Sequence, residues 1–129
     1  MQKQLNNMTV LVVEDEPIIA LDLQFLLEAS GARPVVLEHG LDGARRRLAG
    51  PHLPDVVVLD LVLGGKSSLP LAEELRKRSV PFLFLTGDAV GIPPGFADIR
   101  TIMKPFDADQ LIATVSAVAG NHRTVDQIQ

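Results

Sequence analysis

Acidic, hydroxyl and cationic side chains follow short apolar segments of this chain, and their types are suited to metal binding and phosphoryl transfer. The residues are Glu14, Asp15, Asp60, Thr86 and Lys104. Carboxylates held close together repel one another, and a divalent cation such as Mg²⁺, which prefers oxygen ligands, relieves that repulsion. A carboxylate that attacks phosphorus forms an aspartyl phosphate, whose oxygens a metal, a hydroxyl and an ammonium group can neutralise. These residue types predict Mg²⁺-dependent chemistry at Asp60.

The segments that must position these residues have the length of β-strands. They span residues 9–13, 34–37, 56–63, 82–86 and, more weakly, 99–103. Their nearly continuous apolarity is typical of strands covered on both faces, as in a parallel sheet between helices. Helical patterns lie between or after them, at residues 16–31, 41–48, 69–78 and 108–119. The alternation predicts an open, doubly wound α/β fold, in which ligands collect at the carboxyl ends of the strands.

Two helical segments have distinct features. In the first, apolar side chains at Ile18, Leu21, Phe25 and Leu26 mark one face. At residues 87–98, where a fourth helix should follow the fourth strand, Gly91, Pro93, Pro94 and Gly95 disfavour a helix interior. We therefore expect a single helical turn or an irregular loop there.

Length and composition indicate one globular domain over residues 1–129, with a core at about 9–119 and a frayed polar tail at 120–129. The chain has 47% hydrophobic and 22% charged residues, a formal charge of −4 and no cysteine. The negative charge argues against direct nucleic-acid binding, and no apolar run approaches the roughly 20 residues of a membrane span. The absence of cysteine suits a reducing compartment. We therefore expect a cytoplasmic protein without membrane insertion.

Four motifs together give the sequence a specific resemblance. They are VVEDEP at residues 12–17, VLD at 58–60, LTG at 85–87 and KPF at 104–106. In this order and at the ends of the expected strands, they resemble the receiver domain of bacterial two-component response regulators. The resemblance extends from residue 9 to about 119. It implies a flavodoxin-like, five-stranded parallel sheet with strand order 2-1-3-4-5.

The resemblance also implies roles for individual residues. Asp60 would be the phosphoacceptor. The expected Mg²⁺ ligands are Asp15, Asp60 and the backbone carbonyl of Val62, and Glu14 would reach the metal through water. The peptide bond before Pro105 is expected to be able to adopt the cis form.

Thr86 and Lys104 would contact the phosphoryl group, but the switch that follows must differ from the usual one. Thr101 stands where the family usually has an aromatic switch residue, and Gly64 stands where a proline often follows the phosphoacceptor strand. FLTG at residues 84–87 is similar to the Phe-Ala-Thr-Gly signature of a receiver subgroup that lacks the aromatic residue and often stands alone. We expect signalling through ordering of the loop at residues 87–98.

The expected function is that of a single-domain response regulator rather than a metabolic enzyme. It would receive a phosphoryl group on Asp60 from a histidine kinase or a histidine phosphotransfer protein. With no output domain in the sequence, it would act through contact with an unnamed downstream protein or as a phosphate sink. Self-association into a homodimer is left open.

Three alternatives remain beside this interpretation. The same fold could serve as a phosphorylation-independent interaction module, or as a phosphate-ester hydrolase with an aspartyl nucleophile. The GKS at residues 65–67 invites a P-loop interpretation, but the first glycine of that motif would have to stand at Asp60. We rank the P-loop far below the receiver.

Overall fold

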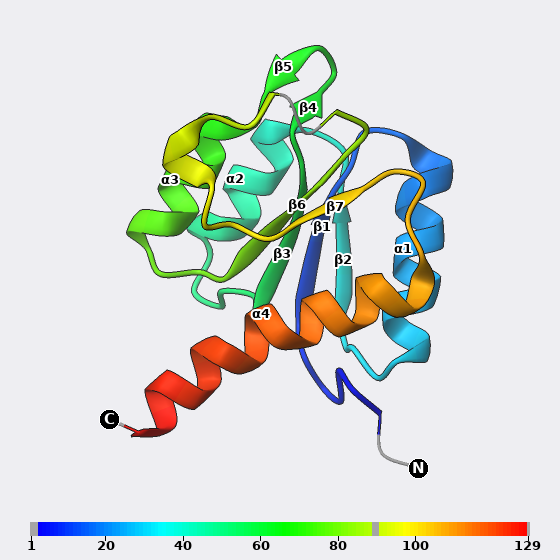
Figure 1. Ribbon diagram of the computed structural model, residues 1–129, viewed down its shortest axis with the longest axis vertical. Helices are drawn as coiled ribbons and strands as arrows, with labels where there is room; N and C mark the ends of the chain where they lie inside the picture. Colours follow the sequence, from blue (N-terminus) through cyan, green and yellow to red (C-terminus); the bar gives the residue numbers. More distant parts are fainter. Residues whose placement is uncertain (1–2, 89–90, 129) are drawn as a thin grey trace.

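The computed structural model describes the backbone of residues 3–88 and 91–128, and the side chains of these ranges up to residue 120. Its centre is a five-stranded parallel sheet (Figure 1). The strands are β1 (Val10–Val13), β2 (Val35–Glu38), β3 (Val56–Asp60), β6 (Phe82–Thr86) and β7 (Thr101–Met103). They lie in the order β2-β1-β3-β6-β7, which confirms the predicted strand order and doubly wound topology.

Helices cover both faces of the sheet, α1 (Pro17–Ala29) and α4 (Ala108–Ile128) on one and α2 (Leu41–Ala49) and α3 (Leu69–Lys77) on the other (Figure 1). Because successive side chains of a strand point to opposite faces, each strand contributes to two cores. In β1, Val10 and Val12 pack into the cluster that contains residues of α1 and α4, whereas Leu11 and Val13 pack with residues of α2 and α3. The continuous apolarity of the strands therefore reflects burial on both faces.

The predicted third strand was too long by three residues. β3 ends at Asp60, and the chain then forms a small hairpin from β4 (Val62–Leu63) and β5 (Lys66–Ser67). Gly64 and Gly65 connect its two strands with φ angles of 57° and 79°. Two central residues with positive φ are typical of a type I′ turn, whose twist matches that of paired strands. The two glycines thus reverse the chain beyond β3.

The first helix packs only Leu26, of the four apolar residues that marked its predicted face, against the core. Ile18, Leu21 and Phe25 are 83%, 60% and 69% exposed. The residues that α1 buries against the sheet include Leu23 and Leu27. The helix is apolar on two sides, so the sequence pattern alone did not identify which side packs against the core.

The segment expected to lack a regular fourth helix does so in its described part. The described part includes the 3₁₀ turn η2 (Pro94–Phe96), and Phe96 packs into the core on the side of α2 and α3. Residues 89–90 of the predicted loop lie outside the described residues.

The core and the last helix extend beyond the predicted limits. Leu5 and Met8 are buried in the cluster beneath α1 and α4, so the core begins before residue 9. α4 continues to Ile128, where a frayed tail from residue 120 was expected. A single glycine at position 120 costs only about 1 kcal/mol in a helix, and no proline follows it. No helix in the described part of the chain has the length and apolarity to cross a membrane.

Candidate functional site

The register of the sheet brings the predicted acidic residues together at the carboxyl end of the strands. Val13 of β1 pairs with Leu59 of β3, which places Glu14 level with Asp60. Carboxylate oxygens of Glu14, Asp15 and Asp60, one from each, all lie within 4.8 Å of one another. Glu14 and Asp60 are buried, whereas Asp15 is exposed at the rim. The expected acidic cluster is therefore present.

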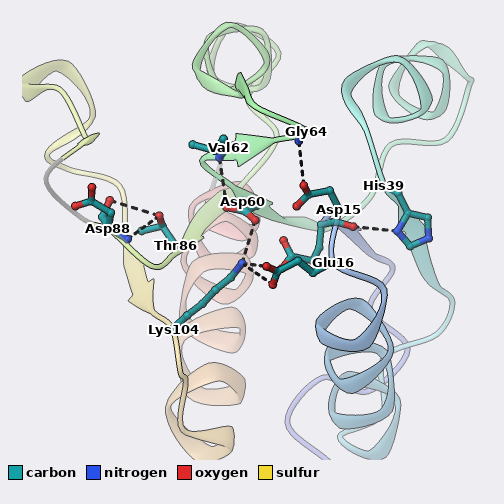
Figure 2. Close-up of polar contacts among 10 residues, drawn as sticks. Asp15, Glu16, His39, Asp60, Val62, Gly64, Thr86, Asp88 and Lys104 are labelled. Carbon is teal, nitrogen blue, oxygen red and sulfur yellow. Dashed lines mark hydrogen bonds and ion pairs between the residues drawn. The ribbon is translucent and has the colours of Figure 1, made fainter.

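Lys104 reaches into this cluster from the end of β7 (Figure 2). Its Nζ lies 2.7 Å from Glu14 Oε1 and 3.0 Å from Asp60 Oδ2, and the exposed carboxylate of Glu16 is 3.9 Å away. The Lys104 backbone N–H donates to the carbonyl of Thr86, and the peptide bond to Pro105 is cis. One ammonium group thus contacts two buried carboxyl groups.

Backbone N–H groups of the hairpin hold two of the acidic side chains (Figure 2). The N–H of Val62 donates to Asp60 Oδ1 at 3.3 Å, and the N–H of Gly64 donates to Asp15 Oδ2 at 3.0 Å. Proline at position 64 would lack this second donor. The glycine in place of the usual proline is therefore part of the site as well as of the turn.

Thr86 lies at the same edge of the sheet, and its hydroxyl contacts the backbone of the following loop. Its Oγ1 accepts a hydrogen bond from the N–H of Asp88 at 3.1 Å and donates to the Asp88 carbonyl at 3.4 Å (Figure 2). The side chain is buried. A movement of this hydroxyl toward Asp60 would release the backbone of Asp88.

Burial of Glu14 dominates the electrostatics of the cluster. Burial, together with the adjacent Asp60, raises the pKa of the Glu14 carboxyl from 4.5 to about 8, against the opposing effect of Lys104. For Lys104, burial disfavours the charged ammonium, but hydrogen bonds to Glu14 and Asp60 outweigh it and raise its pKa. Without a further cation, Glu14 is thus mostly protonated at neutral pH, and Lys104 remains charged.

These residues fit a hard divalent cation. Glu14 Oε2 is buried, and among the described residues it has no hydrogen-bond partner. Such an atom is costly to bury unless something binds it. Three carboxylates of mixed burial at one edge of the sheet are suitable ligands for Mg²⁺, which is commonly held by one or two carboxylates together with water.

The sequence model of the "Response regulator receiver domain" matches residues 10–116, which is most of the chain. The chain belongs to the response regulator receiver family. Receiver domains of two-component systems typically undergo phosphorylation and bind Mg²⁺ in an acidic pocket. The acidic cluster lies where the strands of this receiver fold end, in agreement with such a pocket.

Individual relatives agree with this assignment. The chain is 38% identical over 118 residues to the sensory transduction protein RegX3 of Mycobacterium tuberculosis, covering 85% of this chain and 50% of RegX3. It is 36% identical over 119 residues to the phosphate regulon transcriptional regulatory protein PhoB of Escherichia coli, covering 84% and 50%. The chain therefore spans about half the length of these curated relatives.

Solved structures give the same fold. SdrG of Sphingomonas melonis is 36% identical with a TM-score of 0.74, and the match covers 91% of this chain and 98% of SdrG. The receiver domain of the sensor histidine kinase PA1611 of Pseudomonas aeruginosa has a TM-score of 0.74 at 23% identity, covering 88% and 98%. Its structure has a magnesium ion coordinated in the active-site cleft.

Two contacts of the acidic cluster come from residues that were not assigned to the site from the sequence. One is the backbone donation from Gly64 to Asp15. The other is between His39 Nδ1 and the backbone carbonyl of Glu14, 3.0 Å apart. The glycine pair at residues 64–65 was a signal for the first contact. For the second there was none, because His39 follows a different strand and no motif links it to Glu14.

The Gly64 contact gives a testable expectation for metal binding. Gly64→Pro should weaken Mg²⁺ affinity by about tenfold, because it removes the donor to Asp15 and proline requires a negative φ. Isothermal titration with MgCl₂ measures the effect. Gly65→Ala is the matched control, since it strains the same turn but leaves the Gly64 N–H in place. Equal affinities of Gly64→Pro and Gly65→Ala would contradict a role for this donor.

Proposed function

We propose that this receiver accepts a phosphoryl group on Asp60 from a histidine kinase or a histidine phosphotransfer protein, in a reaction that requires Mg²⁺. The observation that carries the proposal is the position of Asp60 in a receiver-family chain. Its buried carboxylate lies at the end of β3, 3.0 Å from the Lys104 ammonium and beside Glu14 and Asp15.

The chemistry follows from these contacts. A carboxylate oxygen of Asp60 attacks the phosphorus of a phosphohistidine, an O–P bond forms, the P–N bond breaks, and the leaving imidazole takes up a proton. Asp15, Asp60 and the Val62 carbonyl, with Glu14 through water, are the groups that would hold Mg²⁺. The metal, when bound, supplies positive charge for the phosphoryl oxygens.

Two of the chain's own side chains complete the site. Lys104 already contacts Asp60, so its ammonium group is within reach of an oxygen on the modified carboxylate. The Thr86 hydroxyl would leave the backbone of Asp88 and bind another phosphoryl oxygen. The charge that develops during transfer is then met by groups that the fold has already placed.

The surface beside the site favours a protein as the phosphodonor and as the target. α1 begins directly after Glu16 and exposes Ile18, Leu21 and Phe25 on its outer face. A group of large exposed apolar side chains is characteristic of a protein contact surface. We infer that the protein acts through such contacts, or by withdrawing phosphoryl groups from another regulator.

Intact mass spectrometry with acetyl phosphate tests the proposed reaction. We expect a single phosphoryl adduct in the presence of MgCl₂ and none in EDTA, because the carboxylates then lack their cation. If acetyl phosphate gives no adduct, purified histidine kinases replace it as the donor, and the samples with MgCl₂ and with EDTA are compared again. Failure with every donor would favour a phosphorylation-independent interaction module. Turnover of a generic phosphate ester would instead favour a hydrolase.

A further inference from the structure

The segment after β6 is held in place although it lacks a regular helix. Its 3₁₀ turn, η2, places Phe96 in the core, and the Phe96 ring meets the ring of Phe84 edge to face at 5.8 Å between centroids. Ala97 and Ile99 are fixed by backbone hydrogen bonds to the carbonyls of Pro94 and Phe96. The ring contact joins the segment to β6 in the core, and the backbone hydrogen bonds fix the turn itself.

From the outside, a single side chain of α3 holds the same segment. Arg76 donates to both carboxylate oxygens of Asp98, at 3.3 and 3.2 Å, and to the carbonyl of Gly95 at 3.1 Å. Its guanidinium carbon also lies 5.0 Å from the centre of the Phe96 ring. One arginine therefore contacts three residues of the segment at residues 95–98.

Arg76 makes more contacts, and more specific ones, than an ordinary surface ion pair does. The Arg76 and Asp98 side chains are 38% and 65% exposed, and a simple pair at such exposure contributes little. Here the planar guanidinium makes a paired contact with a carboxylate while it also binds a carbonyl and lies over an aromatic ring. Lysine lacks the planar fork that the paired contact requires. The hydrogen bond from Arg76 also lowers the pKa of Asp98.

The contacts of Arg76 with Phe96 and Asp98 are linked to the proposed phosphorylation site through β6. Phe84 and Thr86 lie two residues apart on this strand, one packed against Phe96 and the other bonded to the backbone of Asp88. After residues 89–90, which lie outside the described part of the chain, Ile92 and the η2 residue Phe96 pack against the core, and Arg76 joins η2 to α3. A change at Thr86 therefore has a mechanical route to α3.

We propose that Arg76 is a positioning residue that fastens the segment at residues 95–98 to α3, so that a change at Thr86 is passed to α3 instead of being absorbed by the loop. The role of Arg76 in signalling rests on the proposed phosphorylation of Asp60. The contacts of Arg76 with residues 95–98 are already present in the unmodified protein. These contacts would replace the connection that a regular fourth helix and an aromatic residue at position 101 would otherwise make.

Hydrogen exchange of the unmodified protein tests the fastening. In Arg76→Ala, the amides of Ala97 and Ile99 should exchange about tenfold faster, because their turn loses its external contacts. In Arg76→Lys, the same amides should exchange nearly as fast as in Arg76→Ala, since lysine keeps the charge but lacks the planar fork. Arg45→Ala is the matched control, because Arg45 makes an exposed ion pair with Glu74 on the same side of the protein. Unchanged exchange in Arg76→Ala would overturn the proposal.

NMR spectra with and without beryllofluoride, at saturating Mg²⁺, test the transmission. In the wild type and in Arg45→Ala, we expect amide shifts at Gly87 and Asp88 and also in α3. In Arg76→Ala, the shifts at Gly87 and Asp88 should remain, while those in α3 fall by at least half. A residue with a purely structural role would not change this pattern, so equal α3 shifts in Arg76→Ala would also overturn the proposal.

The two arms separate this inference from the proposed function. If beryllofluoride shifts no amide near Asp60 or Thr86 in the wild type, the phosphorylation proposal fails and transmission from Thr86 fails with it. If the wild type responds at Gly87 and Asp88 but Arg76→Ala leaves exchange and α3 shifts unchanged, only the role of Arg76 is wrong.

Discussion

Lys104→Met is expected to destabilise the folded protein by about 2–3 kcal/mol at about pH 8 in EDTA, because it leaves the buried Asp60 carboxylate and the ionised fraction of Glu14 without their cation. Lys104 is the ammonium group that contacts both Glu14 and Asp60. Methionine has a similar length and no charge. The cost should be smaller at about pH 6, where Glu14 takes up a proton and only Asp60 needs a counter-charge.

Urea unfolding at the two pH values measures this loss. Lys66→Met is the matched control, since Lys66 is exposed on the hairpin and its replacement should change stability by less than about 0.5 kcal/mol. Added MgCl₂ should recover part of the stability of Lys104→Met, because a bound cation can replace some of the lost charge. Equal stability of Lys104→Met and Lys66→Met would contradict the role of Lys104 in the cluster.

Glu14→Gln is expected to have the opposite effect on stability. The folded-state pKa of Glu14, about 8, lies above its ordinary value of 4.5, so folding favours the protonated form. The stability that protonated Glu14 contributes is fully present below pH 4.5 and is lost as the pH rises to about 8. Glutamine carries no charge at any of these pH values. In EDTA at about pH 8.5, the variant should therefore exceed the wild type by on the order of a few kcal/mol.

A series of urea denaturations from acidic to alkaline pH in EDTA gives the test. The wild type should lose stability across the interval between the two pKa values, and Glu14→Gln should show a flatter profile. Asp42→Asn, an exposed acidic residue at the start of α2, should follow the wild type. The stabilised variant should also bind Mg²⁺ more weakly, since it lacks a carboxylate of the cluster. A wild-type profile that rises through this interval would contradict the raised pKa.

The fold was predictable because its strands are buried on both faces. In β3, four aliphatic residues precede an aspartate, and this pattern indicates both a central strand and the position of its carboxyl end. The pattern could not show that the strand ends before the apolar run does. Val62 and Leu63 continue the apolar run, but the positive φ angles of Gly64 and Gly65 turn them into a hairpin. The choice of buried face in α1 depended on packing that no local pattern encodes.

The acidic cluster was predictable from strand ends, because parallel strands deliver their carboxyl ends to one edge. The pairing of side chains within it was not. The contact of Lys104 with Glu14 joins residues 90 positions apart, and the fastening of Asp98 by Arg76 joins residues of α3 and of an irregular segment. Such pairings depend on side-chain reach across the assembled fold. The roles assigned to Val62 and Thr86 toward metal and phosphoryl groups stay predictions.

The most direct test of the central claim is intact mass spectrometry of the wild type, Asp60→Asn and Asp42→Asn after incubation with acetyl phosphate and MgCl₂, or with a kinase shown to phosphorylate the wild type. We expect one phosphoryl adduct on the wild type and on Asp42→Asn, and none on Asp60→Asn, because asparagine lacks the nucleophilic carboxylate. Circular dichroism of Asp60→Asn verifies that the variant is folded. An adduct that persists on folded Asp60→Asn would contradict the claim that Asp60 is the phosphoacceptor.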